Sequence, residues 1–141
     1  MGYGNFIRPK ASKKIGLRAS RPFEFLHMDV SRIRFNDHTK AFLYVVKDNF
    51  SKAVLSYSLD FTCNSATSKK NLELAFQKYN LSKLSQIELV TDDGSENKGY
   101  VTDLLSTNTN VTHRIAQSPS FPKSNSSVES FFHTLKKHIP Y

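Results

Sequence analysis

The hydrophobic pattern of the first part of the chain predicts three strands joined by short turns. Phe23 to Arg34 has extended, mostly apolar character, and Ala41–Lys47 is an almost continuous apolar run, as in a strand that is covered on both faces. Ala53–Leu59 alternates apolar residues with serine, which is typical of a strand with one polar face. Short connections between consecutive strands favour an antiparallel meander.

Helical and strand patterns alternate in the rest of the chain. Apolar residues within Ser65–Tyr79 recur at the i, i+3, i+4, i+7 spacing of an amphipathic helix. After it we expect a strand at Ile87–Val90, a helix at Tyr100–Ser106, a strand at Val111–Ile115, a loop at Gln117–Ser124, and a C-terminal helix with an apolar stripe at Val128, Phe131, Phe132, Leu135 and Ile139. The order βββ-α-β-α-β-α predicts an α/β fold, and the helical crossover into the fourth strand implies a five-stranded mixed sheet.

Charge divides the chain into a basic arm and a core. The 141 residues suit one domain, which we place at 22–141, and the formal net charge of +8 favours a polyanionic partner such as nucleic acid. Residues 1–21 contain no acidic residue and six basic ones, at Arg8, Lys10, Lys13, Lys14, Arg18 and Arg21. Two interpretations remain open, a flexible arm or linker and an arm that lies along phosphates.

Several classes of protein are not expected. A single cysteine, Cys63, excludes an internal disulfide and a cysteine-rich zinc module. No apolar run follows the basic start, so we do not expect a signal peptide, and no stretch of about 18 apolar residues could form a membrane span.

Three acidic residues occupy positions that a structural role alone explains only in part. Asp29 lies among apolar residues of both strand parities, where a carboxylate is disfavoured. Asp92 follows a buried strand, although Asp before a glycine turn is also ordinary. Glu129 completes an S-x-x-E capping box from Ser126, which taken alone favours a cap. Together, a few carboxylates could hold two Mg²⁺ or Mn²⁺ ions for phosphoryl transfer.

Four segments carry a resemblance to a known family. They are Arg21-Pro22 followed by His27-Met28-Asp29-Val30, the run YVVKDNFSK at 44–52, Thr91-Asp92-Asp93-Gly94-Ser95, and the run NSSVESFFHTLK at 125–136. From about Arg21 to His138 the chain resembles the catalytic core of DDE transposases and retroviral-type integrases, closest to bacterial insertion-sequence transposases. The last segment is the most specific of the four.

The resemblance implies a ribonuclease-H-like fold with Asp29, Asp92 and Glu129 as catalytic residues and ligands of two Mg²⁺ or Mn²⁺ ions. It also implies that Lys136 contacts a DNA phosphate and that Asn125 and His133 lie close to the DNA end. From the distribution of charge we add Lys137, which follows Lys136 on the same helix, to the DNA-binding residues. Asp48 matches the family pattern too, but we expect it to shape the turn between the second and third strands. Between Asp92 and Glu129 there are 36 residues, one more than is usual, and counting from Asp93 would restore the spacing. We prefer Asp92 because it keeps the D-x-G-S register.

The expected function is therefore that of a metal-dependent polynucleotidyl transferase, which cleaves transposon ends and joins them to target DNA during DNA integration. The partners implied are transposon-end and target DNA. We also expect a homo-oligomer on DNA, an isolated core that is a monomer or dimer, and a bacterial, nucleoid-associated location in the cytoplasm. Two alternatives remain: a non-catalytic core that only binds DNA, and a ribonuclease-H-like nuclease acting on RNA–DNA hybrids.

Overall fold

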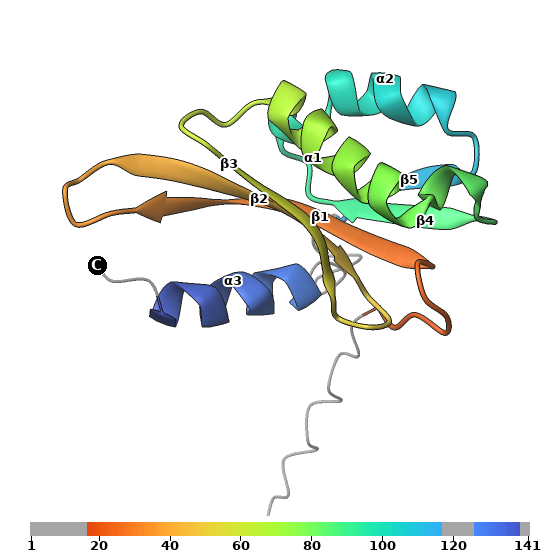
Figure 1. Ribbon diagram of the computed structural model, residues 1–141, viewed down its shortest axis with the longest axis horizontal. Coiled ribbons are helices and arrows are strands. Elements are labelled where there is room, and N and C mark those ends of the chain that lie inside the picture. The colour runs from red at the N-terminus through yellow and green to blue at the C-terminus, as the bar shows by residue number, and fades with distance from the viewer. Residues whose placement is uncertain (1–16, 117–125, 139–141) are drawn as a thin grey trace, which may run out of the picture.

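A mixed five-stranded sheet forms the centre of the protein (Figure 1). The computed structural model describes residues 17–116 and 126–138. The strands are β1 (Phe25–Arg34), β2 (Lys40–Asp48), β3 (Val54–Asp60), β4 (Ile87–Thr91) and β5 (Val111–Ile115), in the spatial order β3-β2-β1-β4-β5. β1, β2 and β3 pair antiparallel, whereas β4 is parallel to both β1 and β5. The predicted meander and mixed sheet are confirmed.

Helices cover both faces of this sheet. They are α1 (Ser65–Tyr79), α2 (Tyr100–Thr107) and α3 (Ser126–His138), with short 3₁₀ turns η1 (Leu81–Lys83) and η2 (Ser95–Asn97). α1 and α2 lie on one face and α3 lies on the other (Figure 1). The predicted order of strands and helices is therefore confirmed. In the described residues, no helix has the length and apolar character that crossing a membrane requires.

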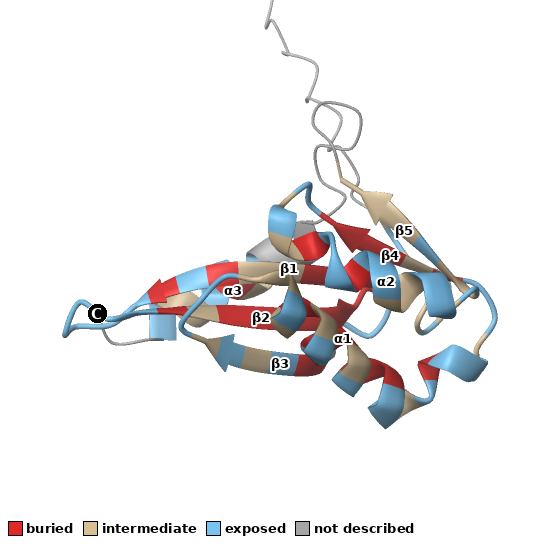
Figure 2. Cartoon of the chain, turned by 90° about the horizontal axis from the view of Figure 1, so that it is seen from above, coloured by how far each residue is buried: buried red, intermediate tan, exposed pale blue. Residues whose placement is uncertain are grey.

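Two hydrophobic clusters hold the layers together. The larger one joins α1 and α2 to the sheet and includes Leu26, Leu72 and Leu89, all fully buried. The smaller one packs Phe132 of α3 against Ile33 and other apolar residues of β1 and β2. Figure 2 shows the buried positions concentrated along β1, β2 and β4. The part of the predicted α3 stripe at Phe131, Phe132 and Leu135 is confirmed, whereas Ile139 and the side chain of Val128 lie outside the described residues.

Helix α1 begins and ends at asparagines. The side chain of Asn64 accepts a hydrogen bond from the backbone N–H of Thr67 at 2.8 Å, which satisfies one donor of the first turn. Asn80 adopts the left-handed conformation, with φ of 51°, and ends the helix. The face between them buries Leu72, Ala75 and Phe76, as the spacing predicted.

Asp48 shapes the turn between β2 and β3, as we expected. Its buried carboxylate accepts hydrogen bonds from the backbone N–H of Phe23 at 3.0 Å and from the N–H and hydroxyl of Ser51 at 3.0 and 2.7 Å. Lys52, at φ of 64°, completes the turn. A carboxylate with three such donors serves the fold, and it is not a member of the acidic group described below.

The residues just before β1 are tied to the core through Asn49. The side-chain oxygen Oδ1 of Asn49 accepts a hydrogen bond from the backbone N–H of Ala19 at 2.8 Å, and its side-chain nitrogen Nδ2 donates to the backbone carbonyl of Leu17 at 3.0 Å. The same nitrogen lies 2.7 Å from Nε2 of the buried His27. Residues 1–16 of the predicted basic arm lie outside the described residues, so the role of the arm stays a prediction.

Candidate metal centre

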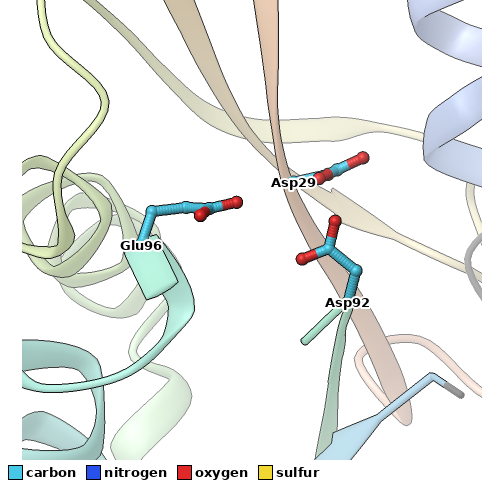
Figure 3. A group of neighbouring side chains, drawn as sticks. All are labelled: Asp29, Asp92 and Glu96. Carbon is cyan, nitrogen blue, oxygen red and sulfur yellow. The ribbon is translucent and has the colours of Figure 1, made fainter. Parts of the chain in front are cut away.

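Three carboxylates from different parts of the chain converge at the C-terminal end of β4. They belong to Asp29 in β1, Asp92 immediately after β4, and Glu96 in η2 (Figure 3). One oxygen from each lies within 4.8 Å of the others. In the part of the chain that the structure describes, this is the only group of three or more potential metal-ligating side chains so placed.

Sheet topology brings Asp29 and Asp92 together. The parallel pairing of β1 with β4 covers only Phe25 to His27, and β1 then continues past the end of β4. Asp29 therefore lies beside the point where the chain leaves β4 at Thr91 and turns away as Asp92. The carboxyl end of a central parallel strand is where open α/β sheets place their ligands.

A short hydrogen-bonded loop fixes the Asp92 carboxylate. Its Oδ1 accepts from the backbone N–H of Gly94 at 3.0 Å and from the amide of Asn97 at 2.7 Å. Asn97 is itself only 1% exposed, so this donor is held in place by the fold. The other oxygen of Asp92 receives no hydrogen bond from any described residue, which leaves it available to a cation.

The strand end that precedes Asp92 is anchored from β5. Thr91 Oγ1 donates to the carbonyl of Asp92 at 2.9 Å and lies 2.7 Å from Nε2 of His113. Burial lowers the pKa of His113, so this imidazole is neutral at neutral pH. Thr91 and His113 therefore position Asp92 through uncharged hydrogen bonds.

Glu96 is the member of the group that sequence reasoning missed. The turn η2 folds the chain back so that the Glu96 carboxylate lies directly against Gly94, where a Cβ would overlap its oxygens. The only signal in the sequence was an acid four residues after Asp92, and such an acid approaches Asp92 only if the loop closes in this way. Gly94 therefore makes space for Glu96.

The negative charges of this group influence the pKa of the nearby Cys63 thiol. This exposed residue follows β3, and the partial burial of its thiol, together with the negative charges of Glu96, Asp92 and Asp29, raises the pKa of Cys63. Its thiolate is therefore scarce at neutral pH.

We predict that a divalent cation lowers the pKa of Cys63, because it would neutralise the carboxylates that now disfavour the thiolate. The measurement is the pH dependence of iodoacetamide alkylation with Mg²⁺ or with EDTA. Cys63 is the single cysteine, so the midpoint reports on this site alone. A midpoint that Mg²⁺ leaves unchanged would contradict cation binding beside Cys63, whereas simple steric blocking would slow alkylation at every pH.

The other predicted site residues lie outside this acidic group or outside the described residues. Asp93 is turned away from the group and forms an exposed ion pair with Lys98 at 2.8 Å. Glu129 lies in the first turns of α3, but its side chain is outside the described residues, as is all of Asn125. Farther along α3, His133 and Lys137 are exposed and Lys136 is half-buried.

The chemistry of the donor set fits a hard divalent cation. The group offers carboxylate oxygens only, without the imidazole or thiolate ligands that zinc prefers. Mg²⁺ and Mn²⁺ bind through a few carboxylates and keep several water ligands, which suits a partly exposed edge of a sheet. The residues present therefore fit the cofactor that the sequence led us to expect.

Solved structures with the same fold include catalytic domains of integrases and transposases. No family profile and no curated protein matches this sequence. The catalytic core domain of HTLV-2 integrase in complex with magnesium is 20% identical, with a TM-score of 0.61, over 85% of this chain and 71% of that one. The catalytic domain of Mos1 mariner transposase is 23% identical, with a TM-score of 0.61, over 84% and 63%. A chain of a simian T-cell lymphotropic virus intasome is 20% identical, with a TM-score of 0.64, over 89% and 46%.

These similarities establish the fold. The chain has the ribonuclease-H-like fold of retroviral integrase and mariner transposase cores, so the predicted fold class and the resemblance in fold are confirmed. The chain spans less than two thirds of the mariner domain and about half of the intasome chain.

Proposed function

We propose that this chain is the catalytic core of a DNA transposase or integrase that cleaves and joins phosphodiester bonds with divalent metal ions. The observation that carries the proposal is the convergence of Asp29 and Asp92 at the end of β4. The fold alone would not support a catalytic function, because one fold can host many functions. Asp29, Asp92 and Glu96 bring three negative charges close together at the end of β4, and a bound cation would neutralise that repulsion.

In this proposal Asp29 and Asp92 hold the metal from the sheet, and Glu129 completes the ligand set from α3. Two bound ions would supply Lewis-acid activation of the attacking oxygen and stabilisation of the leaving oxygen. The chain's own task is positioning. β1 fixes Asp29, and the loop donors Gly94 and Asn97 orient Asp92 with one oxygen outward.

The third carboxylate has two candidates. Glu129 is supported by the resemblance and by its place on α3, a helix anchored to the sheet through Phe132. Glu96 is supported by its position within the acidic group. We assign the third ligand to Glu129 and give Glu96 an electrostatic role, because a three-residue 3₁₀ turn is a weaker support for a ligand than a packed helix.

The DNA-facing residues follow from the same assignment. Lys136 would bind a DNA phosphate, with Asn125, His133 and Lys137 close to the DNA end, and two of these, His133 and Lys137, are exposed on α3. Transposon-end and target DNA would be the partners of a homo-oligomer. An element of the bacterial insertion-sequence type, acting at the nucleoid, remains the source that the sequence motifs favour.

Metal removal tests this function. We expect the chain to nick supercoiled plasmid and to join labelled duplex DNA to it in Mg²⁺ or Mn²⁺, and to lose both activities in EDTA, because the carboxylates alone cannot stabilise the charge that develops on the phosphate. Agarose and denaturing gels measure the two reactions. DNA binding without any metal-dependent cleavage would contradict the proposal and indicate a non-catalytic DNA-binding core.

A further inference from the structure

A cluster of cations lies on the hairpin formed by β1 and β2, away from the acidic group. Arg32, Arg34 and Lys40 are all exposed, and none of them forms an ion pair with any residue that the structure describes. The acidic side chain of the turn between these strands, Asp37, accepts hydrogen bonds from the N–H and hydroxyl of Thr39. These hydrogen bonds lower the pKa of Asp37, so it stays charged. The three cations still outnumber this one acid, and residues 32–40 carry an excess of positive charge.

Strand register places the three cations on one face. Arg34 pairs directly with Lys40, and Arg32 lies two residues away along the same strand. The intervening residues Ser31, Ile33 and Ala41 are buried, and Ile33 packs toward α3. Because successive side chains of a strand alternate between faces, the cations project from the other face, toward the side of the sheet that carries α1. Figure 1 shows that the hairpin extends beyond α1.

This arrangement is unfavourable for folding alone. Like charges directly opposite each other on paired strands repel at a Cβ separation of roughly 5 Å and lower stability. An anion between Arg34 and Lys40 would remove that repulsion, and arginine and lysine are the residues that bind phosphate.

The hairpin is also joined to the acidic group by an open strand edge. Pairing with β4 ends at His27, so from Asp29 onward β1 has β2 on one side and no described strand on the other. Asp29 and Arg34 are five residues apart, which is roughly 17 Å along a strand. That length corresponds to about five base pairs along the axis of duplex DNA.

We infer that the cationic hairpin, Arg32, Arg34 and Lys40, binds the phosphate backbone of duplex DNA about five base pairs from the phosphate at the acidic group. The inference rests on the proposed function for the identity of the polyanion. Because Asp29 and Arg34 are an odd number of residues apart, their side chains lie on opposite faces of the sheet. DNA that crosses the open edge of β1 would therefore meet the carboxylates on one side of that edge and the cations on the other. The contacts would be to phosphate and so would contribute affinity and orientation without reading sequence.

The test compares R34Q/K40Q with a control of equal charge, K70Q/K83Q, whose lysines are exposed on α1 and η1. The probe is a fluorescent 30-base-pair duplex, titrated with the full chain in EDTA over a range of salt concentrations. Each lost phosphate contact lowers the slope of log affinity against log salt by about 0.9. We expect R34Q/K40Q to bind at least about tenfold more weakly near 0.1 M salt, with a slope lower by about 1.8, and K70Q/K83Q to keep the wild-type slope.

A stability readout separates binding from misfolding. Since K40E removes the repulsion with Arg34, we expect its melting temperature to equal or exceed that of the wild type while its DNA affinity falls. Equal weakening by R34Q/K40Q and K70Q/K83Q would overturn the inference, because net charge alone would then explain it. The inference would also be overturned if R34Q/K40Q bound DNA like the wild type but lost binding to an acidic polypeptide such as polyglutamate.

The same variants distinguish this inference from the proposed function. If R34Q/K40Q weakens DNA binding but D29N leaves metal-dependent cleavage intact, the hairpin contact stands and the catalytic proposal fails. If D29N abolishes cleavage and R34Q/K40Q binds DNA like the wild type, the catalytic proposal stands and the hairpin contact fails.

Discussion

Replacing Asp92 or Asp29 with asparagine is expected to lower the rate of Mg²⁺-dependent DNA cleavage and joining by about a thousandfold or more. Such a loss corresponds to about 4 kcal/mol of transition-state stabilisation, which is within the several kcal/mol that a bound metal ion supplies. An amide carries no charge and offers one oxygen instead of two, so D92N and D29N should each weaken the metal site at once.

The structure makes these substitutions conservative for the fold. In Asp92, Oδ1 accepts both loop hydrogen bonds, and an asparagine oxygen in the same place would keep them. In Asp29, Oδ1 accepts from the backbone N–H of Val30 at 2.9 Å, and that bond too can persist. The matched control is D93N, which removes the same charge one residue further along the chain. Asp93 forms an exposed ion pair with Lys98.

We expect D93N to stay within about threefold of the wild-type rate, because exposed ion pairs contribute little. The measurement is the initial rate of plasmid nicking and of duplex joining at saturating Mg²⁺, with melting temperatures to verify folding. A D92N protein that folds and reacts at the wild-type rate, or a D93N protein that loses activity in its place, would show that the second ligand is assigned to the wrong aspartate.

The second large effect is expected at Glu129. The variant E129Q should lower the same rate by about a hundredfold or more, since in our proposal it removes the third metal ligand. The variant E96Q should lower it by less than about tenfold, because we assign Glu96 a contribution of charge near the ions and not a ligand position. Both variants keep the side-chain volume of the glutamate that they replace and remove its negative charge.

Gly94 offers a third variant that moves Glu96 without neutralising it. The backbone of Gly94, with φ of −65°, would accept alanine, and the atoms nearest to the added Cβ belong to the Glu96 carboxylate. We expect G94A to resemble E96Q in rate. If E96Q and G94A both abolish activity while E129Q is nearly wild type, the third ligand is Glu96 and the assignment to Glu129 is wrong.

The sequence could predict the parts of the site that depend on regular structure. Asp29 was identifiable because apolar neighbours of both parities mark a strand interior, and Asp92 because it directly follows a buried strand. The order of elements then placed these two carboxylates at one end of a mixed sheet. The turn role of Asp48 was also predictable, since Asp48 and Asn49 interrupt two strand patterns.

The remaining features depend on geometry that no local pattern encodes. Glu96 approaches Asp92 only because η2 reverses the chain over Gly94. The cationic hairpin was equally hidden, because Arg34 and Lys40 face each other only in the register that the turn between β1 and β2 sets. The link between Thr91 and His113 requires the parallel pairing of β4 with β5.

The most direct test of the central claim is a crystal structure of the protein soaked in Mn²⁺, with anomalous diffraction recorded to locate the metal. We predict a Mn²⁺ peak bound by an oxygen of Asp29 and an oxygen of Asp92, at about the 2.1 Å typical of small divalent cations on carboxylates. Well-ordered Asp29 and Asp92 carboxylates with no anomalous peak between them at millimolar Mn²⁺ would contradict a metal-dependent catalytic core.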